Sequence, residues 1–268
     1  MTAQPRLFAA VFTIAAATLM APAHAGRSCE SRPPTTASIA RGLSLAQKTV
    51  QALDASGADV VILARAGQDL TPYGLRYSHL GFAYRVPTAD GDHVWRVLHK
   101  LNQCGTAEAS IYRQGLGEFF LDDPWRYEAA WVALDSNAQA RLLPLLQDNL
   151  RSTALHVKSY SMVSYAWGQR YQQSNQWALE TLAEGLEPVV GTRQQAQSWL
   201  RARGYQPITL HIGAFTRLGA RLTAANVAFD DHPSERRFSD QIDTVTVDSI
   251  FAWLQRSGLG GATNVVRE

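Results

Sequence analysis

The sequence of 268 residues has few of the features that most often reveal a function. It has only two cysteines, no C-x-x-C or H-x-x-x-H pattern, no Gly-rich phosphate loop and no dinucleotide fingerprint, so we expect no metal and no cofactor. Its formal net charge is only +2, and its basic residues are scattered along the chain. A nucleic-acid partner is therefore not expected.

A long apolar run occurs only near the N-terminus. Arg6 precedes apolar residues from Leu7 to Met20, and a small-x-small pattern ends at Ala25. This combination is typical of a signal peptide, so we expect cleavage after Ala25 and a periplasmic or secreted protein. Residues 26–268 contain no linker rich in Pro, Gly or Ser and no second long apolar run, so we expect them to form one domain without an integral membrane segment.

Export affects the interpretation of the two cysteines. An even number of cysteines in an oxidising compartment favours a structural disulfide, here between Cys29 and Cys104. The alternative is that Cys104 is a nucleophile served by His99. No helix N-terminus lowers the pKa of the thiol in that alternative, so the disulfide is preferred.

Hydrophobic periodicity predicts an α+β fold with an antiparallel sheet packed against helices. The Asp90-Gly91 pair predicts a hairpin turn between the second and third strands. The predicted helices are 37–56, 137–150, 174–186, 193–203 and 245–254. The predicted strands are 60–64, 77–86, 94–101, 110–113, 127–134 and 208–212, with one more within 218–229 and a charged loop at 232–237.

His79 is a polar residue on an otherwise apolar strand, in the stretch RYSHLGFAYR. Counting from the hairpin turn, Leu101 faces His79, and a diagonal contact brings His99 within reach. An imidazole oriented by a second polar group suits a general base. The alternative is a structural histidine packed in the core beside Leu80 and Phe82.

Ser174 begins the predicted helix in the stretch RYQQSNQWALE. It could be a nucleophile, but serine is also a common N-cap residue, so the position has a purely structural interpretation. A helix dipole does not convert a hydroxyl to an alkoxide, and catalysis by Ser174 would need a base close by.

These segments, together with GLGEFFLDDP and TVDSIFAWLQRSG, resemble domain of unknown function 2145, a family of uncharacterised exported bacterial proteins. That family is remotely similar to circularly permuted NlpC-like proteins of the papain type. The resemblance aligns His79-Leu80-Gly81-Phe82 and Ser174-Asn175-Gln176-Trp177 with the His and Cys motifs of those relatives, and His99 with their third polar residue. It implies a permuted papain-like sheet and a cleft at the helix start.

The resemblance also implies a mechanism. In an amide or ester hydrolase or acyltransferase, His79 would take the proton of Ser174, His99 would orient His79, and N–H groups near Asn175 and Gln176 would hold the oxyanion. With Ser in place of Cys, the alternative is a noncatalytic binding or structural protein of the envelope. Its ligand would be a peptide, a peptidoglycan fragment or a lipid. Trp177 and an aromatic rim of Phe119, Phe120, Trp125 and Trp131 are further candidate binding residues, or else core residues.

Overall fold

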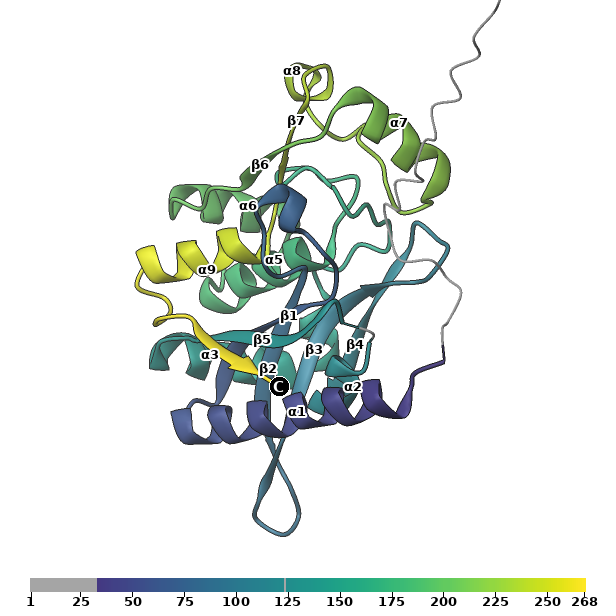
Figure 1. Ribbon diagram of the computed structural model, residues 1–268. Coiled ribbons are helices and arrows are strands. Elements are labelled where there is room, and N and C mark those ends of the chain that lie inside the picture. The colour runs from purple at the N-terminus through teal and green to yellow at the C-terminus, as the bar shows by residue number, and fades with distance from the viewer. Residues whose placement is uncertain (1–32, 123) are drawn as a thin grey trace, which may run out of the picture.

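A computed structural model describes residues 33–122 and 124–268 of the chain (Figure 1). Its centre is an antiparallel sheet with the strand order β4-β3-β2-β1-β5-β8. The strands are β1 (Val60–Ala66), β2 (His79–Pro87), β3 (His93–Asn102), β4 (Ala109–Gly115), β5 (Arg126–Ala133) and β8 (Asn264–Arg267). The expected class, an antiparallel sheet packed against helices, is confirmed.

Helices pack on both faces of this sheet. One face carries α1 (Thr36–Ser56) and α2 (Leu116–Phe120), and its apolar core includes Leu53, Val61 and Phe119. The other face carries α3 (Ser136–Gln147), α5 (Ser174–Leu186), α6 (Arg193–Ala202) and α9 (Val247–Arg256), with a core that includes Ile62, Phe82 and Trp177. Each residue of β1 is buried because helices cover both faces of the sheet at this strand.

A smaller unit lies beyond the sheet, at the end of the molecule opposite the β2–β3 turn (Figure 1). It pairs β6 (Ile208–His211) with β7 (Gln241–Thr244) and adds α7 (Ala214–Thr223) and α8 (Ser234–Arg237). Its own apolar cluster includes Ile212, Phe229 and Ile242. The chain enters this unit after α6 and returns through β7 to α9, so both connections tie it to the main body.

The strongest sequence signals predicted their elements well. The hairpin is present with Gly91 at φ 85°, and the helix 174–186 has the predicted bounds. The helix expected at 137–150 ends at Gln147 and is followed by a separate α4 (Asn149–Thr153), because Asp148 accepts from backbone N–H groups of a new first turn. The short 3-10 turn η1 (Thr71–Tyr73) was not predicted.

The prediction for 218–229 was wrong. No strand forms there, because residues 214–223 form α7, an amphipathic helix whose Arg217 and Ala220 are buried. Within the charged loop expected at 232–237, residues 234–237 form α8. The strands β7 and β8, of four residues each, were not predicted.

Two predictions fall on residues that the structure does not describe. The predicted signal peptide lies outside the described residues, as does Cys29, so both the signal peptide and the disulfide with Cys104 stay predictions. Among the helices of residues 33–122 and 124–268, none combines the length and hydropathy that a membrane crossing requires.

Candidate functional site

A cleft of about 1020 Å³ lies between the main body and the smaller unit. His79, at the start of β2, and Ser174, at the start of α5, both line it. Leu210 and Ile212 from the smaller unit and Ala220 from α7 line it as well. The structure thus brings the two principal sequence candidates to one cavity, within or slightly above the usual size range of small-molecule sites.

His79 is the end of a chain of side-chain hydrogen bonds that crosses three strands. Its Nε2 lies 2.8 Å from Nδ1 of His99, and Nε2 of His99 lies 2.7 Å from Oε1 of Gln114 on β4. The amide of Gln114 then donates to Glu118 on α2 at 2.9 Å. The predicted contact between His79 and His99 is therefore present.

This series of hydrogen bonds fixes the tautomer of His79. Because the Gln114 amide N–H donates to Glu118, its oxygen faces His99 and must accept from Nε2–H of that ring. Neutral His99 then offers Nδ1 as an acceptor, so His79 donates from Nε2 and keeps an unprotonated Nδ1. No hydrogen bond to this Nδ1 is formed by any residue in 33–122 or 124–268, and His79 lines the cleft.

Both rings are held neutral. Burial, the nearby Arg65 guanidinium and His99 lower the pKa of His79 well below its ordinary value. Burial and Arg65 lower the pKa of His99 to about 3. Arg65 lies opposite His79 in the β1–β2 pairing, and its guanidinium donates hydrogen bonds to the Phe119 carbonyl and the Asp122 carboxylate. A neutral His79 is a hydrogen-bond acceptor, but the positive charge nearby opposes formation of its imidazolium.

Gly81 makes room for the His99 ring. A Cβ on Gly81 would lie 2.7 Å from the Cβ of His99 and 2.8 Å from the carbonyl oxygen of Leu98. These distances are shorter than packed side chains allow. The glycine of the His79-Leu80-Gly81-Phe82 motif thus has a physical role, since any side chain at this position would displace the partner of His79.

Ser174 is not the N-cap of α5, so that structural interpretation was wrong. The cap is Gln173, whose side chain accepts from the Asn175 N–H at 3.2 Å and donates to the Val245 carbonyl at 2.5 Å. Ser174 is the first helical residue, and its hydroxyl lies beside the buried phenol of Tyr160.

Ser174 and His79 share the cleft without a hydrogen bond between them. The reason lies in the alternation of β2: Phe82 packs edge-on against Trp177 of α5, whereas His79 faces the opposite layer and packs on Phe119. The start of α5 reaches the start of β2 through Asn175, whose Oδ1 accepts from the Leu80 N–H at 3.1 Å. Leu101 is not paired with His79, because the β2–β3 ladder extends only to Phe82 and Leu98 at this end.

The other predicted binding residues have structural contacts. Asn175 lines the cleft, but its own N–H already donates to Gln173, so this N–H is not available to hold an oxyanion in this arrangement. Gln176 accepts from Ser164 and donates to two backbone carbonyls, and Trp177 is fully buried. Of the four rim aromatics, only Trp125 lines the cleft; Phe119, Phe120 and Trp131 are core residues.

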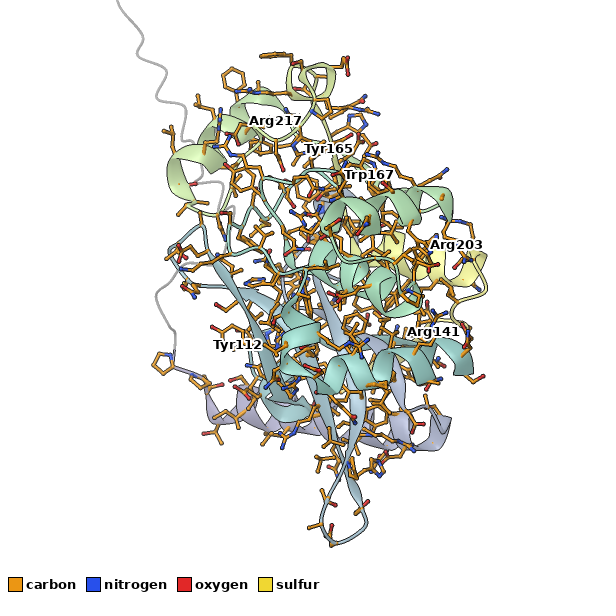
Figure 2. The ribbon with its side chains drawn as sticks, turned by 180° about the vertical axis from the view of Figure 1, so that it is seen from behind. Tyr112, Arg141, Tyr165, Trp167, Arg203 and Arg217 are labelled. Atoms are coloured by element: carbon orange, nitrogen blue, oxygen red, sulfur yellow. The ribbon has the colours of Figure 1, made fainter. Side chains whose placement is uncertain are left out.

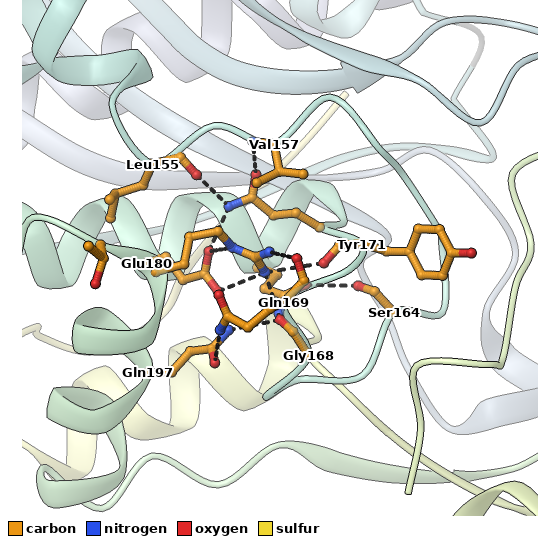
Figure 3. A network of polar contacts seen from close by, with 12 residues as sticks. Leu155, Val157, Ser164, Gly168, Gln169, Tyr171, Glu180 and Gln197 are labelled. Carbon is orange, nitrogen blue, oxygen red and sulfur yellow. Dashed lines mark hydrogen bonds and ion pairs between the residues drawn. The ribbon is translucent and has the colours of Figure 1, made fainter.

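A second buried polar network lies on the other face of β3 (Figure 3). The ammonium of Lys100 donates to the Val157 carbonyl and to Gln172, and Gln172 donates to Glu180 of α5. Glu180 forms an ion pair with Arg193 of α6 at 2.7 Å, with both side chains almost fully buried. This network fixes the segment before Ser174, because Gln172 lies two residues ahead of it.

Sequence reasoning missed several residues of the site. Tyr160 and Gln173 line the cleft, and Gln114 orients His99. Gln173 had no recognisable signal because glutamine is not a usual N-cap residue. Gln114 had none because it pairs in register with Val97 rather than with His99. Cys104 also lines the cleft. In the part of the chain that the structure describes, no three His, Cys, Asp or Glu side chains are grouped as metal ligands.

The chain belongs to the family of domain of unknown function 2145, described as an uncharacterized protein conserved in bacteria, which matches residues 52–254. The matched segment contains His79, His99, Gln114 and Ser174, and also α7. No curated protein and no solved structure matches the chain. Family membership confirms the resemblance to this family, and the likeness to papain-type proteins stays a prediction.

Proposed function

We propose that this chain is an exported envelope protein that binds an amphipathic ligand in the cleft, on a permuted papain-like scaffold without efficient catalysis. The observation that carries the proposal is that the side chains of Ser174 and His79 interact with other residues and not with each other. The Ser174 hydroxyl lies beside Tyr160 and His79 is hydrogen-bonded to His99, so no hydrogen bond among the described residues joins the hydroxyl to a base. His79, kept neutral by burial and Arg65, is better suited to accept a hydrogen bond than to carry a proton.

The lining of the cleft supports this function. Near its sheet end it has placed polar groups, Nδ1 of His79 and the side chains of Ser174 and Gln173. Toward the smaller unit it is lined by Ile212 and Phe229, among other apolar residues. Apolar walls with a few fixed polar groups are typical of ligand pockets. The ligand would donate to His79 and pack its apolar part against the smaller unit.

Binding of N-phenyl-1-naphthylamine, a neutral apolar fluorophore, tests the cleft directly. We expect saturable binding with one probe per chain. Ala224→Trp places an indole in the cleft and should weaken binding at least roughly tenfold, whereas Leu150→Trp, at an exposed site on α4, should not. Weak, unsaturable binding that Ala224→Trp leaves unchanged would contradict the proposal.

A second candidate is an amide or ester hydrolase or acyltransferase. It is favoured by the unprotonated Nδ1 of His79, which lines the same cleft as Ser174. In this candidate the Ser174 hydroxyl would leave Tyr160 and transfer its proton to His79 as it attacks a carbonyl.

A fluorophosphonate probe separates the two candidates. The binding proposal predicts that the probe does not label the wild type. It also predicts that the thiol of Ser174→Cys reacts with iodoacetamide faster than free cysteine does, because the thiol lies at a helix N-terminus. Labelling of Ser174 that is lost in His79→Ala, with the fold retained, would establish the hydrolase. Ser174→Ala is the matched control for both reagents.

A further inference from the structure

The smaller unit presents apolar side chains to solvent on a protruding end. Phe215, Leu218 and Leu222 of α7 are 85%, 56% and 78% exposed, and Phe238, directly after α8, is 83% exposed. The three α7 residues follow the i, i+3, i+7 spacing of one helix face. Large apolar side chains gathered in this way mark interaction surfaces.

The opposite face of α7 holds the helix in place. Arg217, labelled in Figure 2, is buried and donates to the carbonyls of Ile212, Arg237 and Gln241. Ala220 packs in the apolar cluster below and lines the cleft. The helix therefore cannot turn its exposed apolar face inward without breaking these contacts.

The charge around the exposed face is positive on α7. Helix α7 contains no Asp or Glu, and Arg221 is exposed next to Leu222, whereas Arg217 is buried on the opposite face and adds no charge to the exposed one. Arg237 is exposed beside Phe238, over whose ring its guanidinium lies. Glu235 and Asp240 are also exposed on the α8 side, so the cationic character is confined to α7 and its junction with α8.

We infer that the face formed by Phe215, Leu218, Leu222 and Phe238, the α7 face, docks on the surface of a bilayer containing anionic phospholipid. Large apolar residues on one side of a helix with exposed arginines nearby, here Arg221 on α7 and Arg237 on α8, are typical of a surface that lies in the lipid interface. Helices α7 and α8 lie at one end of the molecule, as Figure 1 shows, and the side chains of the α7 face are exposed there, so a flat surface can reach them. Because Ala220 lines the cleft from the same helix, docking also places the cleft next to the lipid.

Vesicle flotation tests the inference. The full chain should float with vesicles of phosphatidylglycerol and phosphatidylethanolamine and bind more weakly to phosphatidylcholine alone. Leu218→Ser with Leu222→Ser should lower the partition coefficient by roughly tenfold or more for each leucine. Arg221→Gln should lower it less, and only at low salt. Leu150→Ser, at a residue that is 84% exposed on α4, is the matched control and should change nothing.

A local probe separates docking by α7 from any binding by the apolar residues 7–20, which are the same in all variants. A nitroxide on Leu222→Cys should become more accessible to oxygen and less accessible to a nickel chelate when anionic vesicles are added, while one on Leu150→Cys should not. An unchanged nitroxide at 222 would overturn the inference. So would a wild-type dimer in solution that the double serine variant converts to a folded monomer, because the α7 face would then bind a second copy.

Discussion

His99 and Lys100 are neighbours on β3, yet their side chains enter two different polar networks. His99 faces α2 and joins His79, Gln114 and Glu118 in a chain of hydrogen bonds that leads to the cleft. Lys100 faces α5 and joins an ionic network that is closed on every side by backbone and side-chain partners. The difference shows that burial of polar residues does not by itself identify a functional site.

What separates the two networks is a remaining hydrogen-bonding capacity. In the Lys100 network, Glu180 accepts from Gln172, Arg193 and Gln197, so its carboxylate is satisfied internally. In the His79 network, one ring nitrogen keeps a lone pair at the cavity. We therefore assign a structural role to the first network and propose ligand binding for the second.

The largest effect is expected from breaking the ionic network. Arg193→Met removes the partner of a carboxylate that is almost fully buried, and we expect unfolding to require roughly 3 to 5 kcal/mol less free energy. Urea denaturation measures this change. Arg170→Met, which breaks the surface pair with Asp230, is the control and should cost about 1 kcal/mol or less. Equal losses in both variants would mean that the buried Glu180–Arg193 pair stabilises the fold no more than a surface pair does.

Lys100 should give the stability a pH dependence of defined sign. Burial lowers its pKa from the ordinary 10.5 to about 7 in the folded protein. Between these values the unfolded chain holds the extra proton, so stability should rise as the pH increases from 7 to 10.5, by at most about 1.4 kcal/mol per pH unit. Lys100→Met should flatten this rise. An identical slope in wild type and variant would show that Lys100 keeps its ordinary pKa.

Gly81→Ala should disturb the His79 network while leaving the Lys100 network intact. The added Cβ would approach the Cβ of His99 to 2.7 Å, and overpacking of this kind destabilises by roughly 1 to 3 kcal/mol. Gly219→Ala, inside α7 with open space around the new Cβ, is the matched control and should be neutral or stabilising. Thermal unfolding compares them, and a tolerated Gly81→Ala would mean that His99 can shift freely.

The smallest effects concern the start of α5. Gln173→Ala removes the cap and its bond to the Val245 carbonyl and should cost about 1 kcal/mol or somewhat more. Ser174→Ala should cost less, since it removes only the hydroxyl beside Tyr160. If Ser174→Ala were the more destabilising of the two, Ser174 would hold the helix start and the assignment of Gln173 as cap would be incorrect.

The sequence was sufficient to predict the sheet class, the hairpin and the helix that begins at Ser174, because each has a strong local signal. It also predicted that His79 and His99 meet, since a hairpin turn defines the register of its strands. It could not predict which face of the sheet His79 occupies relative to α5. That orientation depends on how α5 packs against β2, a contact between residues about a hundred positions apart in the chain.

The smaller unit was the least predictable part. Residues 218–229 contain enough apolar residues for a strand, but burial of Arg217 against three carbonyls selects the helix instead. The cap by Gln173 was equally hidden, because its side chain is held by Thr244 and Val245 from distant β7 and its exit. Both features depend on tertiary contacts that no local pattern records.

The proposed ligand binding depends on the protonation state of His79. Long-range proton–nitrogen correlation NMR of the imidazole side chains measures this state directly. We predict that His79 at pH 7 is neutral with its proton on Nε2 and an unprotonated Nδ1, and that it stays so as the pH is lowered well below 6.5. Gln114→Ala should disturb this state, because it removes the acceptor that sets the His99 tautomer. A His79 protonated on Nδ1, or an imidazolium already formed near pH 6.5, would contradict the assignment.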